Sequence, residues 1–141
     1  MIASTNNQPV RQILILAVER DPHVRSLARY FMEQAGYRVE FTDNGAQALE
    51  QARLLLPDIL LSEILVPQVD GLSVCRALKA DPATRRIAVL IFSILAAEDR
   101  AREAGADAFL RKPLDDAQLI RSIEQLLDQR NYRRENAHGA N

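Results

Sequence analysis

Five polar residues at the ends of short apolar segments carry the side chains that could do chemistry. They are Glu19, Arg20, Glu63, Ser93 and Lys112. The two carboxylates could form an acid–base pair, but such a pair needs surroundings that drive the two pKa values apart. Basic neighbours instead keep both carboxylates ionised. An α/β enzyme that uses Glu19 and Glu63 is therefore an alternative with little support.

The apolar segments alternate with amphipathic stretches along the chain. A continuous apolar run at 13–18 predicts a strand buried on both faces, and further strands are predicted at 38–42, 59–61, 88–92 and 108–110. Helices are predicted at 22–35, 44–56, 71–80, 98–104 and 115–129, with Leu27 and Leu56 on the buried faces of the first two. This alternation predicts an α/β fold with a parallel sheet covered on both faces. Ligands gather at the carboxyl ends of such strands, where the five polar residues stand.

Length and composition indicate one compact domain. The chain has 141 residues, of which 48% are hydrophobic and 26% are charged, and its net charge of −1 favours neither nucleic acid nor a membrane surface as a partner. A single cysteine excludes an internal disulfide and fits a cytoplasmic location. The polar ends are predicted to be disordered tails at 1–12 and 130–141, on either side of a domain at 13–129. The second tail is too short for another folded domain, so we expect output through a partner or by assembly.

Several short motifs, in this order and spacing, resemble the receiver domain of response regulators in two-component phosphorelay signal transduction. The resemblance covers about 13–127. Its motifs are PDILLSEILVPQVDG at 57–71, GYRV at 36–39, NGAQAL at 44–49, GADAF at 105–109 and KPL at 112–114. It implies a flavodoxin-like (βα)5 fold, a doubly wound five-stranded parallel sheet with strand order 2-1-3-4-5. It also implies a signalling protein, not an enzyme.

The residues of the family's phosphorylation site carry over unevenly. Glu63 stands where the family has the aspartate that accepts the phosphoryl group, so its carboxylate is displaced by up to one C–C bond, about 1.5 Å. Glu19 matches the first of two adjacent acids that hold Mg²⁺, but Arg20 stands in place of the second. Ser93 and Lys112 match the hydroxyl and the lysine of the family's pocket.

Three further positions follow from the same resemblance. Ile94, beside Ser93, is bulky where the family has a small residue. Phe109 matches the aromatic switch position that accompanies Ser93. Pro113 is expected to follow a cis peptide bond.

These substitutions predict a degenerate receiver, or pseudo-receiver. A guanidinium offers no lone pair to Mg²⁺, so we expect no functional magnesium site and no cofactor. We expect the charge of Arg20 to replace that of the cation, so that the formal charges of Glu19, Glu63, Arg20 and Lys112 sum to zero. Phosphoryl transfer depends on positioning, and an error of about 1 Å costs on the order of 10²-fold in rate. We therefore expect little or no phosphorylation, and a receiver that accepts phosphate inefficiently at Glu63 is the alternative.

Two roles for Glu63 remain open from the sequence. It could form a structural ion pair with Arg20, which is the favoured hypothesis because an unpaired buried charge is costly. It could also mimic phospho-aspartate by contacting Lys112 and Ser93, and the two roles can coexist. In either case the resemblance implies contact with a histidine kinase or a downstream effector through the fourth helix, fifth strand and fifth helix. That fourth helix is about one turn shorter than is usual in the family. The sequence also leaves open whether the chain forms a homodimer.

Overall fold

The structure, a computed structural model, describes the chain from residue 11 to residue 139, with side chains described to residue 131. Its strands are β1 (Leu14–Val18), β2 (Arg38–Thr42), β3 (Ile59–Ser62), β4 (Ala88–Ser93) and β5 (Ala108–Arg111). Its helices are α1 (Pro22–Gln34), α2 (Gly45–Leu55), α3 (Gly71–Ala80), α4 (Glu98–Glu103) and α5 (Asp116–Gly139). The strand and helix positions predicted from the sequence are confirmed to within a few residues, except at the end of α5.

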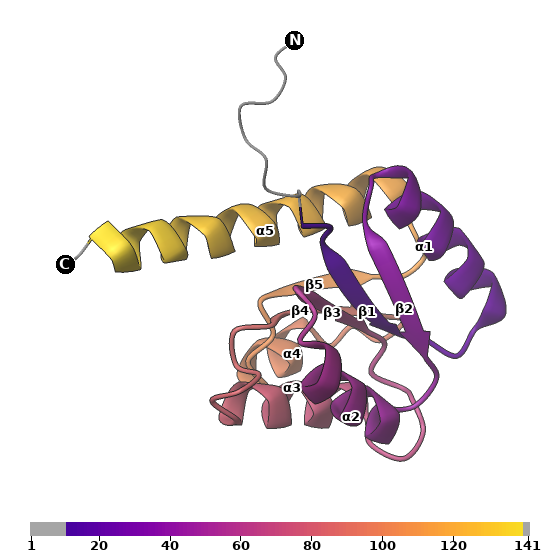
Figure 1. The fold of residues 1–141 in the computed structure, drawn as a ribbon. Coiled ribbons are helices and arrows are strands. Elements are labelled where there is room, and N and C mark those ends of the chain that lie inside the picture. The colour runs from indigo at the N-terminus through magenta and orange to yellow at the C-terminus, as the bar shows by residue number, and fades with distance from the viewer. Residues whose placement is uncertain (1–10, 140–141) are drawn as a thin grey trace, which may run out of the picture.

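The five strands form one parallel sheet in the order β2-β1-β3-β4-β5, as predicted. Figure 1 shows α1 and α5 on one face of this sheet and α2, α3 and α4 on the other. Successive strand side chains point to opposite faces. Leu16, Leu60 and Ile91 accordingly pack with the α2–α3–α4 layer, while Ile15 and Leu90 pack with α1 and α5.

The buried faces of α1 and α2 differ from the prediction. In α1 the buried residues are Ala28 and Met32, one turn apart, and Leu27 lies beside this stripe with half of its surface exposed. Leu56 follows α2 in a left-handed conformation (φ 47°) that takes it off the helical face, and it is 53% exposed. The core assignments of Leu27 and Leu56 were therefore wrong.

The two predicted tails are shorter than expected. Helix α5 does not stop near residue 129 but continues to Gly139, so residues 130–139 are helical where a disordered tail was predicted. At the other end, Arg11 and Gln12 are placed by hydrogen bonds to Asp58 and to the carbonyl oxygen of Gly36. The remaining tail residues, 1–10 and 140–141, lie outside the described part of the chain.

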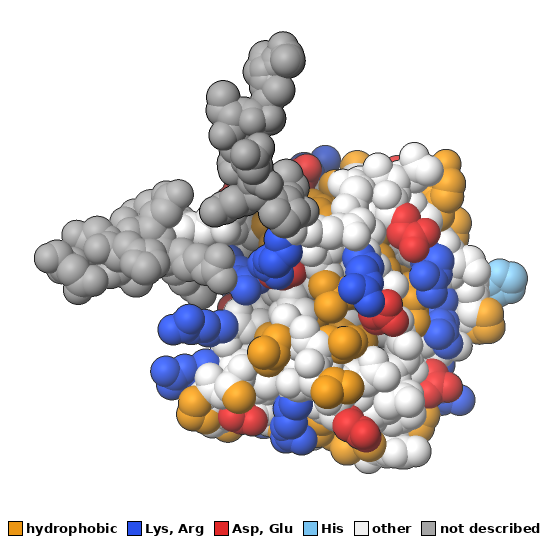
Figure 2. All heavy atoms as spheres, in the orientation of Figure 1, with side chains coloured by type: hydrophobic (Ala, Val, Ile, Leu, Met, Phe, Trp, Pro, Cys, Tyr) orange, Lys and Arg blue, Asp and Glu red, His pale blue; other side chains and the backbone are white. Residues whose placement is uncertain are grey.

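The surface mixes charges of both signs. Figure 2 shows basic and acidic side chains interspersed on one face, with apolar side chains between them. Within the described residues, no helix combines the length and the apolar character needed to span a bilayer.

Candidate functional site

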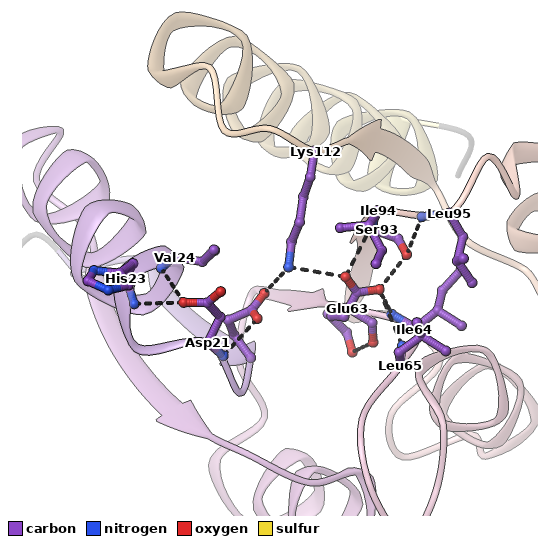
Figure 3. Close-up of polar contacts among 12 residues, drawn as sticks. Asp21, His23, Val24, Glu63, Ile64, Leu65, Ser93, Ile94, Leu95 and Lys112 are labelled. Atoms are coloured by element: carbon purple, nitrogen blue, oxygen red, sulfur yellow. Dashed lines mark hydrogen bonds and ion pairs between the residues drawn. The ribbon is translucent and has the colours of Figure 1, made fainter.

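The site lies at the carboxyl edge of the sheet, because four of its residues end or follow neighbouring strands. The amide of Glu63 donates to the carbonyl oxygen of Val18 (3.1 Å), which aligns the ends of β3 and β1. The amide of Lys112 donates to the carbonyl oxygen of Ser93 (2.8 Å), which aligns the ends of β5 and β4. This register brings the side chains of Glu63, Ser93 and Lys112 together, as the sequence predicts (Figure 3). Glu19 joins them through its contact with Lys112.

One oxygen of the Glu63 carboxylate is held by the loop that follows its own strand. Its Oε2 atom accepts hydrogen bonds from the backbone amides of Ile64 (2.6 Å) and Leu65 (3.2 Å) and from the hydroxyl of Ser93. Close packing holds this loop, since a Cβ atom at Gly71 would lie 2.2 Å from the carbonyl oxygen of Glu63. Residue type alone gives no sign of the two amide donors, and the sequence analysis missed them.

The other carboxylate oxygen contacts the neighbouring strands. Oε1 of Glu63 accepts a hydrogen bond from the amide of Ile94 (3.2 Å) and lies 3.1 Å from Nζ of Lys112. Glu63 is only 5% exposed and Ser93 is fully buried. Burial acts to raise the pKa of Glu63, but the hydrogen bonds from Ser93 and Lys112 outweigh it and the pKa is lowered. The carboxylate is therefore charged at neutral pH.

Lys112 joins the two carboxylates of the site. Its Nζ lies 2.7 Å from Oε1 of Glu19 and 5.4 Å from the centre of the Phe92 ring, in addition to its contact with Glu63. Burial acts to lower the pKa of Lys112, but the hydrogen bonds to Glu19 and Glu63 outweigh it and the pKa is raised. Two carboxylates and one ammonium give this buried cluster a formal charge of −1.

Arg20 does not take part in that cluster. Its side chain is exposed, and no ion pair joins it to Glu19 or Glu63 in the described part of the chain. The chain turns into α1 at this point: the amide of Asp21 donates to Oε2 of Glu19 (3.1 Å), and the Asp21 carboxylate caps the helix by accepting from the amide of His23 (2.8 Å). The predicted Glu63–Arg20 pair was therefore wrong, and so was the neutral pocket.

The remaining predicted positions lie around the cluster. The Lys112–Pro113 peptide bond is cis, as expected. Phe109 is half-buried and packs against the α2–α3–α4 layer. The amides of Ile94 and Leu65 donate to Glu63, and the two residues are 56% and 52% exposed.

The donor set at this edge does not suit Mg²⁺. Magnesium needs nearly octahedral oxygen ligation. Here Oε1 of Glu19 is held by Lys112 and Oε2 by the Asp21 amide, both oxygens of Glu63 accept hydrogen bonds, and Arg20 has no lone pair to offer. The residues described at this edge therefore do not fit Mg²⁺.

A doubly wound five-stranded parallel sheet with acids, a hydroxyl and a lysine at its carboxyl edge defines a flavodoxin-like class of fold. Within this class, the chain belongs to the response regulator receiver domain family, whose model matches residues 15–124. It is thus a receiver domain, which is a signalling domain of two-component systems.

Two curated relatives show the extent of the similarity. The chain is 35% identical to the polar-differentiation response regulator DivK of Brucella anthropi over 116 residues, which cover 80% of this chain and 94% of DivK. It is 33% identical to the DNA-binding dual master transcriptional regulator RpaA of Synechocystis over 116 residues, or 80% of this chain. The matched region spans only about half of RpaA, namely 48%.

Solved structures agree with this assignment. The receiver domain of a signal transduction histidine kinase from Syntrophus aciditrophicus superposes with a TM-score of 0.76 at 35% identity, over 82% of this chain and 90% of that one. The receiver domain of the sensor histidine kinase PA1611 from Pseudomonas aeruginosa has a TM-score of 0.77 at 26% identity, over 84% of this chain and 99% of that one. In the latter structure a magnesium ion is coordinated in the active-site cleft.

Proposed function

We propose that this chain is a pseudo-receiver whose switch state is set by Glu63 and not by phosphorylation. One observation carries the proposal. The Glu63 carboxylate is bound at the same time by the Ser93 hydroxyl, the Lys112 ammonium and the amides of Leu65 and Ile94. These groups come from three different strand ends, so a single side chain joins the loops after β3 and β4 to the end of β5.

The extra methylene of glutamate makes this arrangement reachable. An aspartate at the same position would be shorter by about 1.5 Å, and a phosphoryl group added to it would extend it toward Ser93 and Lys112. The mimicry is partial in charge, because a carboxylate carries −1 and a phosphoryl group about −1.5 to −2. Glu63 therefore resembles a phosphorylated aspartate more closely in the distance that it spans than in the charge that it carries.

The same contacts oppose phosphorylation of Glu63. A nucleophilic oxygen must approach the phosphorus in line and unobstructed. Both oxygens of Glu63 already accept hydrogen bonds, and the residue is buried. The lowered pKa of Glu63 also speaks against a general acid at this position. An enzymatic role for Glu19 and Glu63 is accordingly not proposed.

Signalling would then pass through contacts with a protein partner. We propose that a histidine kinase or a downstream effector binds the surface formed by α4, β5 and α5, which lies next to the strand ends that Glu63 joins. Helix α4 has only six residues, with buried Ala101 and exposed charged side chains such as Arg100 and Arg102. A short helix of this kind gives the surface its own shape and so a means of selecting its partner.

Phosphorylation with a small phosphodonor tests the proposal. The wild-type chain is incubated with the donor and Mg²⁺, and its intact mass is measured; no acyl-phosphate adduct of about +80 Da should form. An Arg20→Asp, Glu63→Asp variant restores the family's acids and serves as the control, because it should gain the adduct under the same conditions. A stable adduct on wild-type Glu63 would refute the proposal in favour of an inefficient but active receiver.

A further inference from the structure

A further buried carboxylate, Asp58, lies at the amino ends of the strands and has no part in the site that Glu19 and Glu63 share. It immediately precedes β3 and is completely buried. Its Oδ2 atom accepts from the amide of Leu14 (2.9 Å) and from Arg11 (3.2 Å), and its Oδ1 atom accepts from Arg11 (2.7 Å) and from Arg130. One carboxylate therefore binds two arginines from opposite ends of the chain.

Asp58 needs these partners, because a buried charge without a counter-ion is strongly destabilising. Burial acts to raise the pKa of Asp58, but hydrogen bonds from Arg11, Leu14 and Arg130 outweigh it and the pKa is lowered. Arg11 is 61% exposed at its side chain, whereas Arg130 is 22% exposed. The more enclosed of the two contacts is the one from helix α5.

Arg130 lies where α5 leaves the domain. Among the residues of α5 whose side chains are described, Leu126 is the last buried one, and the partly buried Leu127 follows it. Past Arg130 the helix continues to Gly139, and Figure 1 shows this end running out beyond the edge of the sheet. An open cavity of about 290 Å³ lies here, lined by both arginines, by Asp58 and by Tyr37 and Asp128 among others. Apolar packing is thus thin at this turn.

We propose that Asp58 anchors helix α5 at the point where the helix leaves the domain, and that Arg11 shares this anchor, so that the segment entering β1 and the departing helix are held by one carboxylate. The anchor makes the end of α5 a rigid arm whose direction is fixed by the domain.

Hydrogen exchange of α5 in the full chain tests the anchor. Arg130→Ala should speed exchange of the amides at 124–131 by about tenfold, the effect of one lost charged hydrogen bond, and should leave 116–122 unchanged. Arg121→Ala is the matched control, since Arg121 is an exposed arginine on the same helix. Equal exchange at 124–131 in the two variants would overturn the proposal.

The sharing of Asp58 has its own test. Arg11→Ala alone should slow exchange at 124–131 or leave it unchanged, because Arg130 then holds Asp58 alone. Combining Arg11→Ala with Arg130→Ala should speed exchange by more than the product of the single effects, and adding Asp58→Asn should reverse much of that excess by removing the unpaired charge. A double variant that equals the product of the singles, or a triple variant no better protected than the double, would contradict a shared anchor.

Discussion

Nζ of Lys112 lies 3.1 Å from Oε1 of Glu63, in a site where the lysine is 11% exposed and the glutamate 6% exposed at their side chains. The same ammonium lies closer to Glu19, at 2.7 Å. Lys112 thus pairs with Glu19, at a position where the family also has an acid, and with Glu63, at the position where the family has an aspartate. The stability of this cluster should consequently depend on all three charges together.

Glu63→Gln should lower stability by about 1–3 kcal/mol at pH 7, because the neutral amide loses charged hydrogen bonds in a buried site. The lowered pKa of Glu63 means that the carboxylate's contribution is fully present above the ordinary value of 4.5 and is lost as pH falls through the folded-state value. The gap in unfolding free energy between wild type and variant, measured with urea, should therefore shrink below pH 4.5. A gap that stays constant from pH 7 to pH 3 would be incompatible with this role.

Lys112→Met should destabilise the domain by about 3–5 kcal/mol, since Glu19 and Glu63 would remain buried without a cation. Adding Glu63→Gln to Lys112→Met should recover part of this loss, because one of the two unpaired charges is then removed. Urea unfolding of the wild type, both single variants and the double variant completes a double-mutant cycle. Additive free energies would show that Lys112 and Glu63 do not interact as the structure places them.

Ser93→Ala should cost about 1–2 kcal/mol, because Glu63 loses a hydroxyl donor and the amide of Leu95 loses its acceptor at 3.2 Å. Ser26→Ala is a suitable control: Ser26 is an exposed residue of α1, and its loss should change stability by no more than about 0.5 kcal/mol. Thermal unfolding compares the two variants. Equal melting temperatures of the Ser93→Ala and Ser26→Ala variants would show that the Ser93 hydroxyl does not stabilise the site.

Sequence patterns predicted the gathering of Glu19, Glu63, Ser93 and Lys112 because each follows a strand, and the carboxyl ends of parallel strands meet at one edge. The partner of Glu63 was harder to predict. Arg20 is adjacent to Glu19 in sequence, but neighbouring residues at a strand end point in opposite directions, and Arg20 faces solvent. Adjacency to Glu19 in the sequence was therefore a poor guide to whether Arg20 contacts Glu63.

The loop amides and the end of α5 lay beyond what residue types could indicate. Every residue except proline has an amide donor, so nothing in the identities of Leu65 and Ile94 marks them as ligands of Glu63. The stretch after residue 129 is polar and lacks an apolar stripe, which suggested a tail. The structure instead continues the helix there and ties Arg130 to Asp58, a contact across 72 positions in sequence.

The most direct test of the central claim compares the amide NMR spectrum of the wild-type chain with that of the Arg20→Asp, Glu63→Asp variant, before and after phosphorylation with a small donor and Mg²⁺. The relevant signals are those of Leu65, Ile94 and the β5 residues. If Glu63 stands in for the phosphoryl group, the wild-type signals should lie near those of the phosphorylated variant. Wild-type signals that match the unphosphorylated variant would contradict the account.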